Sequence, residues 1–264
     1  MADTDAVRGA GLPDCLPAVH TPSSPGQPAA EPEKVMTLVD HLTELRTRIV
    51  RSIVAVIIGT AIGFLVAPQI KLFLVGPLPA SALPLQVLGP GDAFGIQLRI
   101  SVVVGIILAM PVLLYQLWSF VAPGLTSAER RALRPWIPLA LFFFILGVSI
   151  AYAILPFAIG FLLAFTDTVI VAHLAAPPYF DFVTTMFLAF GLLMEFPIVL
   201  YALARVGILS SARLRSSRRM IILGIAIFAA VATPGGDLVS PTILGGTMYI
   251  LFELTVVAIR RSGR

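Results

Sequence analysis

Charged residues are scarce in this chain, and their scarcity excludes an ordinary soluble domain. Only 12% of the 264 residues are charged, against about 25% in a typical soluble protein. Hydrophobic residues make up 58% of the chain, and the mean hydropathy is +0.97. This composition is typical of a polytopic membrane protein, in which several helices cross the bilayer and short segments connect them.

Residues that bind metals or carry out nucleophilic catalysis are also few. The single cysteine, Cys15, excludes an internal disulfide and a cysteine-based metal site. The three histidines, His20, His41 and His173, do not have the spacing of metal ligands. The sequence contains no nucleotide-binding glycine loop, no HExxH motif and no Ser/His/Asp set. We therefore expect no cofactor, no metal and no enzymatic activity.

The first 35 residues contain too much proline to form a helix or a strand. We predict that residues 1–35 are a disordered cytoplasmic tail. They do not resemble a signal peptide, because no apolar stretch follows a basic start. An alternative is that the native chain starts at Met36.

Six apolar runs predict six transmembrane helices. They lie at about 49–67, 94–117, 135–157, 182–204, 219–233 and 241–259. Residues 36–259 are thus expected to form one transmembrane domain, and residues 260–264 a cytoplasmic tail. The last two runs are short compared with the ~20 residues that cross a hydrocarbon core. A re-entrant hairpin over 220–259 is the main alternative to two full spans.

An amphipathic stretch precedes the first run. Its apolar residues recur at helical spacing, namely Leu38, Leu42, Leu45 and Ile49. No helix-breaking residue separates this stretch from the run. We therefore expect one helix that passes from the membrane surface into lipid.

Arginines are concentrated in alternate connecting segments, and this asymmetry predicts the orientation. They lie before the first run, between the second and third, between the fourth and fifth, and at the end of the chain. The remaining connections contain only Lys71. Because positively charged segments stay in the cytoplasm, both chain ends are predicted to be cytoplasmic. The net charge of +4 is thereby explained without a nucleic-acid partner.

Glu195 is the most unusual acidic residue, because it lies in the fourth apolar run. A carboxylate at that depth costs about 3 kcal/mol or more unless it faces a partner, a cavity or the protein interior. Pro197 follows two residues later and is expected to bend the helix and open space beside the carboxylate. Local pairing with a threonine or the backbone is the simpler alternative.

Two further glutamates have structural as well as functional explanations. Glu44 can pair with Arg48 one helical turn away. Glu129 falls in the first turn of a helix that Thr126 or Ser127 can cap. The functional alternative is that these carboxylates, on a basic cytoplasmic surface, bind a cationic partner.

Five motifs in order along the chain resemble those of TatC, the multispanning subunit of the twin-arginine protein translocase. They are HLTELRTR at 41–48, PVLLYQLWSFVAPGL at 111–125, ERR at 129–131, FGLLMEFP at 190–197 and TPGGD at 233–237. The resemblance covers about 36–259. It implies six helices in a concave, glove-like arrangement, with both ends cytoplasmic, in a bacterial cell membrane.

The resemblance also implies a function and a set of site residues. A TatC-type protein is the signal-peptide receptor and core of a translocase that exports folded proteins using the proton gradient. Its implied partners are TatA- and TatB-type single-span proteins, twin-arginine signal peptides and further copies of itself. The positions matching signal-peptide contacts are Glu44, Arg46, Phe120, Pro123, Leu125 and Glu129. Glu195 matches an intramembrane polar site that faces partner helices, and Pro77 and Asp237 match extracytoplasmic loop positions.

The last hairpin departs from the family pattern. Gly235 and Gly236 stand where many relatives have a second proline, and Pro241 stands where a polar residue often follows the serine. Thr247 stands where a proline is common. Taken by itself, Asp237 most resembles a turn residue.

Two other functions are consistent with an apolar bundle. A small-molecule secondary transporter would place Glu195 in its substrate or proton site, but the sequence shows no inverted repeat. An intramembrane enzyme would need a nucleophile with a base, or a metal set, and the sequence offers no candidate for either.

Overall fold

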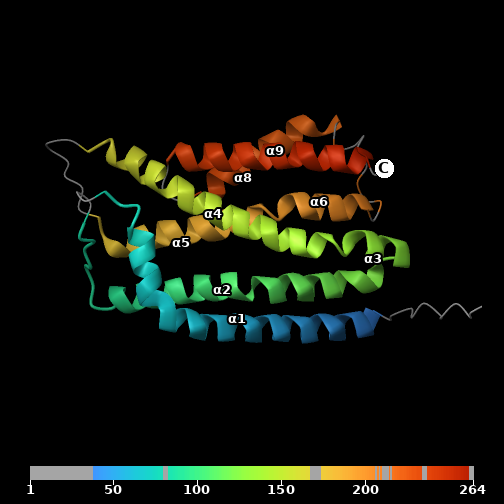
Figure 1. Ribbon diagram of the computed structural model, residues 1–264, viewed down its shortest axis with the longest axis horizontal. Coiled ribbons are helices and arrows are strands. Elements are labelled where there is room, and N and C mark those ends of the chain that lie inside the picture. Colours follow the sequence, from blue (N-terminus) through green and yellow to red (C-terminus); the bar gives the residue numbers. More distant parts are fainter. Residues whose placement is uncertain are drawn as a thin grey trace, which may run out of the picture. The chain divides into compact units, whose positions relative to one another are not determined.

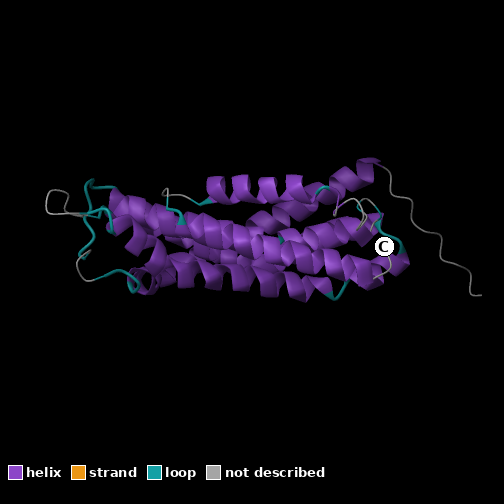
Figure 2. Ribbon diagram, turned by 90° about the horizontal axis from the view of Figure 1, so that it is seen from above, coloured by secondary structure: helices purple, strands orange, loops and turns teal. Residues whose placement is uncertain are grey.

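The chain is helical wherever secondary structure is well defined. The computed structural model describes residues 38–79, 83–166, 174–205, 207, 209, 214, 216–233 and 237–261. The helices are α1 (Leu38–Val75), α2 (Asp92–Val121), η2 (Ala122–Gly124), α3 (Ser127–Leu133), α4 (Trp136–Leu163), α5 (Ala176–Leu193), α6 (Phe196–Arg205), α8 (Arg218–Ala232) and α9 (Val239–Arg261). These ranges contain no β-strand, which confirms the all-α class (Figure 1 and Figure 2). The predicted tail at 1–35 lies outside the described residues.

Five helical stretches of the described chain are long and apolar enough to cross a membrane. They are Val39–Val75, Asp92–Gly124, Glu129–Leu163, Ala176–Ala204 and Val239–Arg261. A sixth apolar helix, α8, has only 15 residues, fewer than the ~20 needed to span a hydrocarbon core. The prediction that the last two helices are both short is wrong for α9, which has 23 residues and also includes the first two residues of the expected tail.

The first helix continues through a proline at which the sequence predicts its end. α1 is unbroken as far as Val75, although the first predicted run ends at about residue 67, directly before Pro68. Proline has no N–H to donate to the carbonyl four residues earlier, which here is that of Phe64. The side-chain amide of Gln97 on α2 donates to this carbonyl instead, with an Nε2–O distance of 2.9 Å. A contact from the neighbouring helix therefore replaces the missing bond.

Glycines bring α1 and α2 into close contact. A Cβ added at Gly59 would lie 2.5 Å from the carbonyl oxygen of Gly105, and one added at Gly63 would lie 2.5 Å from that of Ser101. Small residues let helix backbones approach closely, and such packing drives much of helix association in a bilayer. The outer face of α1 is apolar and exposed at residues such as Leu65, as expected for a surface that contacts lipid.

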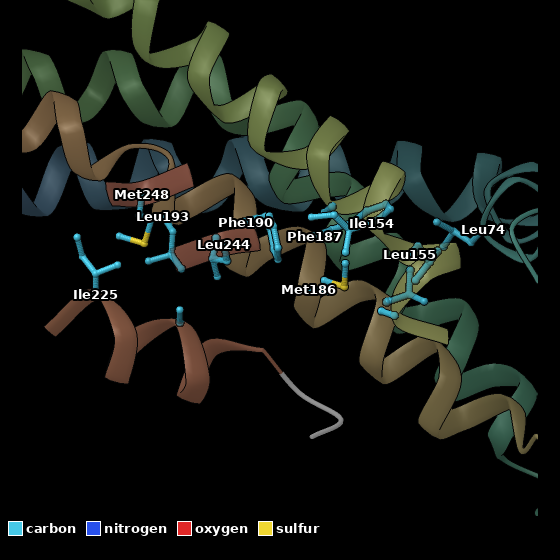
Figure 3. Close-up of a cluster of buried hydrophobic side chains, with 14 of the residues drawn as sticks. Leu74, Ile154, Leu155, Met186, Phe187, Phe190, Leu193, Ile225, Leu244 and Met248 are labelled. Atoms are coloured by element: carbon cyan, nitrogen blue, oxygen red, sulfur yellow. The ribbon is translucent and has the colours of Figure 1, made fainter. Parts of the chain in front are cut away.

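α5 supplies much of the buried core and packs against α2, α4 and α8. Met186, Phe187 and Phe190 of α5 are buried. Figure 3 shows these side chains in one cluster with Ile154 of α4 and Leu244 of α9. The central position of α5 means that residues at its end lie inside the bundle.

Two connecting segments meet at the end of the bundle where α1 finishes. The N–H of Gln86 donates to the carbonyl of Leu174 at 2.9 Å, and the N–H of Ala176 donates to the carbonyl of Gln86 at 2.7 Å. The buried hydroxyl of Tyr179 donates to the carbonyl of Leu74 at 2.5 Å. Because the last carbonyls of a helix lack partners within it, this bond satisfies one of them and joins α5 to α1.

The Gln97–Phe64 contact can be tested by a double-mutant cycle with Pro68. Gln97→Leu leaves the Phe64 carbonyl without a donor and is expected to lower the free energy of unfolding by about 1–2 kcal/mol. In a Pro68→Ala background the new backbone N–H at position 68 supplies the donor, so the same change should cost much less. Denaturant unfolding of the purified protein in detergent measures all four variants. Equal costs in both backgrounds would contradict the compensation.

Candidate functional site

A large apolar groove lies between α2, α4, α6, α8 and α9. Its volume is about 980 Å³. Representative lining residues, one or two from each helix, are Leu114, Trp118, Trp136, Val199, Phe228 and Met248. Leu193, Ile225 and Met248, which also line it, are labelled in Figure 3. We call this space the apolar groove.

Glu195 is the one carboxylate among the residues that line the apolar groove. It is 8% exposed, and its Oε1 is buried without a hydrogen-bond partner among the described residues. The local threonine pairing considered from the sequence is therefore not observed for this oxygen. A buried polar atom without a partner costs free energy. A hydrogen-bond donor placed in the groove next to Oε1 would remove this cost.

The break between α5 and α6 places Glu195 there. α5 ends at Leu193 and α6 begins at Phe196. Pro197 lacks the N–H that would continue the helix ladder to Leu193, whereas the carbonyl of Glu195 accepts from Ile198 at 3.0 Å and begins the next helix. The expected effect of Pro197 is thus seen as a helix interruption beside the carboxylate.

A polar cluster joins the beginning of α1 to the end of α2. Arg48 forms an ion pair with Glu44, and its Nε donates to Glu44 Oε1 at 2.9 Å. Its Nη1 donates to Oε1 of Gln116 on α2 at 3.2 Å. The other oxygen of Glu44, Oε2, is buried without a hydrogen-bond partner in the described part of the chain. The predicted i,i+4 pair is confirmed, and it satisfies only one of the two carboxylate oxygens.

Gln116 is a site residue that sequence reasoning missed. It is buried, at 8% exposure, and it is held by the guanidinium of Arg48. The only signal was an amide within an apolar run, in the stretch Leu114-Tyr-Gln-Leu-Trp118. That signal does not indicate which helix the amide faces.

An aromatic stack links the same two helices. The rings of His41 and Phe120 lie with their centroids 4.4 Å apart at an interplanar angle of 21°. Of the other predicted signal-peptide positions, Arg46 and Pro123 are exposed and Leu125 is half-buried at the apolar groove. Of the residues matched to signal-peptide contacts, Leu125 lines the apolar groove, and Glu44 and Phe120 take part in the contacts between α1 and α2.

Glu129 forms a capping box at the start of α3. Its N–H donates to Thr126 Oγ1 at 3.4 Å, and its Oε2 accepts from the N–H of Thr126 at 3.1 Å. The cap is Thr126, and Ser127 is the first helical residue. Figure 1 shows α3 at the same end of the bundle as the beginning of α1. Glu129 and Glu44 are therefore at one end, both partly committed to local contacts.

Pro77 and Asp237 lie near the opposite end. Pro77 is half-buried in the turn after α1. Asp237 is 4% exposed, and its Oδ2 accepts from the N–H of Ser240 at 2.6 Å in the first turn of α9. Its Oδ1 is buried without a partner among the described residues. Asp237 therefore has a structural role as an acceptor for the first turn of α9, and the expected turn at 234–236 lies outside the described residues.

A second intramembrane carboxylate, Glu253, was also missed. Its Oε2 accepts from Arg218 Nη2 at 2.7 Å, and its Oε1 accepts from the hydroxyl of Tyr249 at 3.3 Å. The pair ties the first residue of α8 to α9. An acidic residue in the final apolar run was the available signal.

These features define a multi-pass helical membrane protein with an apolar groove and carboxylates at both ends and in the middle of its bundle. The family model of the Sec-independent protein translocase protein (TatC) matches residues 40–246. The chain belongs to the TatC family, so it is a component of a Sec-independent protein translocase. The resemblance inferred from the sequence motifs is confirmed.

Individual relatives agree with this assignment. The chain is 35% identical over 225 residues to the TatC protein of Carboxydothermus hydrogenoformans, covering 85% of this chain and 93% of the relative. It is 36% identical over 226 residues to that of Aquifex aeolicus, covering 84% and 93%. A crystal structure described as the twin arginine translocase receptor TatC superposes with a TM-score of 0.73 at 34% identity, covering 83% of this chain and 98% of that one. Family membership leaves the solute-transporter and intramembrane-enzyme alternatives without support.

The cap at Asp237 gives a stability prediction. Asp237→Ala removes the acceptor for the Ser240 N–H and is expected to lower the free energy of unfolding by about 1–2 kcal/mol. Asp237→Asn keeps an acceptor of the same shape and should retain most of that stability. Thermal unfolding of both variants in detergent separates the two effects. A loss in the Asn variant as large as in the Ala variant would show that the cap hydrogen bond is not the source.

Proposed function

We propose that this chain is the signal-peptide receptor and core subunit of a twin-arginine translocase. With single-span TatA- and TatB-type partners it exports folded proteins across the membrane using the proton gradient. The observation that carries this proposal is a carboxylate with one unpartnered oxygen, Glu44, which Arg48 joins to α2, together with a large apolar groove that α2 also lines. A signal peptide with consecutive arginines and an apolar segment offers the complementary features.

The proposed orientation places both chain ends in the cytoplasm of a bacterial cell. It rests on the arginine-rich connections. The beginning of α1 and α3 then face the side from which signal peptides arrive, and Pro77 and Asp237 lie on the extracytoplasmic side. The helices form a concave, glove-like receptor, with the apolar groove as its hollow side, and several copies assemble in one complex.

Carboxylates are suited to select arginine. The guanidinium keeps its proton and donates several N–H groups in a plane, whereas lysine offers a point charge with less geometric fit. Arg48 occupies Oε1 of Glu44, so an arginine of the signal peptide is expected to donate to Oε2. Glu129 supplies a second negative charge at the same end of the bundle. Two carboxylates on neighbouring elements can therefore favour two neighbouring arginines.

The apolar groove and Glu195 are proposed to receive a partner helix. An apolar helix packs its side chains against the groove walls by van der Waals contact. A polar group on that helix can donate to the unpartnered Oε1 of Glu195, and a hydrogen bond in a region without water discriminates between helices with and without a donor. Partner selection is then separate from the recognition of arginines at Glu44 and Glu129.

Receptor function predicts a loss of signal-peptide binding when the carboxylates are removed. Glu44→Gln and Glu129→Ala are each expected to weaken binding of a twin-arginine peptide about tenfold, equivalent to about 1.4 kcal/mol. Site-specific crosslinking and titration with a labelled peptide measure this. Asp40→Asn, which removes an exposed carboxylate from the same helix as Glu44, is the matched control and should leave binding near the wild-type level.

A peptide with two lysines in place of the arginines completes this test. It should bind weakly to the wild-type protein, and the two glutamate variants should bind both peptides alike. Unchanged crosslinking in both glutamate variants would refute the proposed receptor residues.

The proposed role of Glu195 predicts that removing its carboxylate impairs assembly. Glu195→Ala is expected to reduce co-purification with single-span partners and export of a folded cargo by about tenfold, while the chain stays inserted. Glu195→Gln keeps a hydrogen-bonding side chain of the same size and should restore most assembly. Export is measured in a strain without another copy of the protein. Normal export by the Ala variant would exclude a required role.

A further inference from the structure

A second hollow opens between the first turns of α2 and α5. Its volume is about 500 Å³. The residues that matter for its chemistry are Gly91, Asp92, Gly95, Leu98, Arg99 and Asp181. None of them lines the apolar groove. We call this hollow the α2–α5 notch.

An ion pair between two helices forms one side of the notch. Nη1 of Arg99 on α2 pairs with Oδ1 of Asp181 on α5. The remaining guanidinium nitrogens bond to α5 as well: Nε donates to Thr184 Oγ1 at 3.0 Å, and Nη2 donates to Thr185 Oγ1 at 3.2 Å. A guanidinium has five N–H donors, so these contacts hold it in place and leave two donors available.

The ion pair is exposed at the surface of the bundle. The side chains of Arg99 and Asp181 are 42% and 52% exposed. Arg99 is the eighth residue of α2, so it lies about 10 Å along the helix axis from its start. A charge exposed at that depth is costly unless a polar group accompanies it. Phospholipid headgroups are the polar groups that a bilayer supplies there.

The charges of the notch favour a headgroup that carries both signs. Asp92 is the first residue of α2, and its Oδ2 accepts from the N–H groups of Leu88 at 3.1 Å and Gly89 at 2.8 Å. These two bonds fix the position of the carboxylate. Two carboxylates and one guanidinium give the notch a formal charge of about −1. A purely anionic headgroup is therefore disfavoured. A phosphate can bind the two remaining donors of Arg99, and a primary ammonium can bind Asp181 and Asp92.

Glycines provide the room for such a group. A Cβ added at Gly91 or Gly95 would meet no atom within 4 Å. The side of the notch toward the middle of α2 is apolar, at Leu98 and Val102. An acyl chain can continue along these residues once the headgroup is bound, since their side chains are exposed.

We propose that the α2–α5 notch binds a phospholipid whose headgroup contains a phosphate and a primary ammonium, of the phosphatidylethanolamine type. The site is separate from the signal-peptide residues and from the apolar groove. It joins α2 to α5 through a lipid at the membrane boundary, in addition to the direct bonds of Arg99.

Native mass spectrometry of the purified full-length protein tests the proposal. The protein is released from detergent after incubation with equal amounts of phosphatidylethanolamine, phosphatidylcholine and phosphatidylglycerol of the same acyl chains. Phosphatidylethanolamine should be retained at least about tenfold more than phosphatidylcholine, whose ammonium has no N–H to donate, because charge-assisted hydrogen bonds are lost. Equal retention of the two, or a preference for the anionic phosphatidylglycerol, would overturn the proposal.

Substitutions locate the lipid. Gly95→Leu fills the notch without removing the ion pair and should abolish the preference for phosphatidylethanolamine. Gly160→Leu on α4 is the matched control, because a Cβ there also meets no atom within 4 Å, and it should keep the preference. A Gly95→Leu protein that still prefers phosphatidylethanolamine would place the lipid elsewhere and refute this site. The wild-type comparison of the three lipids remains decisive if the variant does not fold.

Discussion

The absence of water from the bilayer core is the constraint on which the rest of this structure depends. Every backbone N–H and C=O at that depth needs a partner within the protein. The fold meets this demand with helices, and with a side chain where a helix lacks a donor: the side-chain amide of Gln97 donates to the Phe64 carbonyl that Pro68 leaves without a partner. Glu195 shows the same demand left unmet, since its Oε1 is buried without a partner among the described residues.

Sequence patterns predicted the helices well because apolar runs report directly on burial in lipid. They failed where a residue far away in the sequence forms a contact that alters the local structure. The helix end expected at Pro68 depends on Gln97, which is a neighbour only after α1 and α2 pack. In the same way, the pairing of Glu44 with Arg48 follows from spacing along one helix, whereas the contribution of Gln116 depends on which faces of two helices meet. The motif resemblance supplied the family, which periodicity alone could not.

Three acidic residues lie in three different parts of the described structure. Glu44 lies near the beginning of α1, Asp237 directly precedes the first turn of α9, and Glu195 lines the apolar groove. In the described chain each has one buried oxygen without a hydrogen-bond partner. Buried unsatisfied groups are uncommon and concentrate at functional sites. In a translocase component, such groups are suited to bind partners transiently, because the protein itself does not satisfy their hydrogen bonds.

The close approach of α1 and α2 has a mechanical consequence. With backbone atoms in contact at Gly59 and Gly63, neither helix can slide or rotate without a clash, so the pair behaves as one stiff rod. α8 is its opposite: it buries only Ile225 and Ala229, and it is tied to α9 by an ion pair at Arg218. The apolar groove is therefore bounded on one side by the tightly packed α2 and on another by the sparsely buried α8.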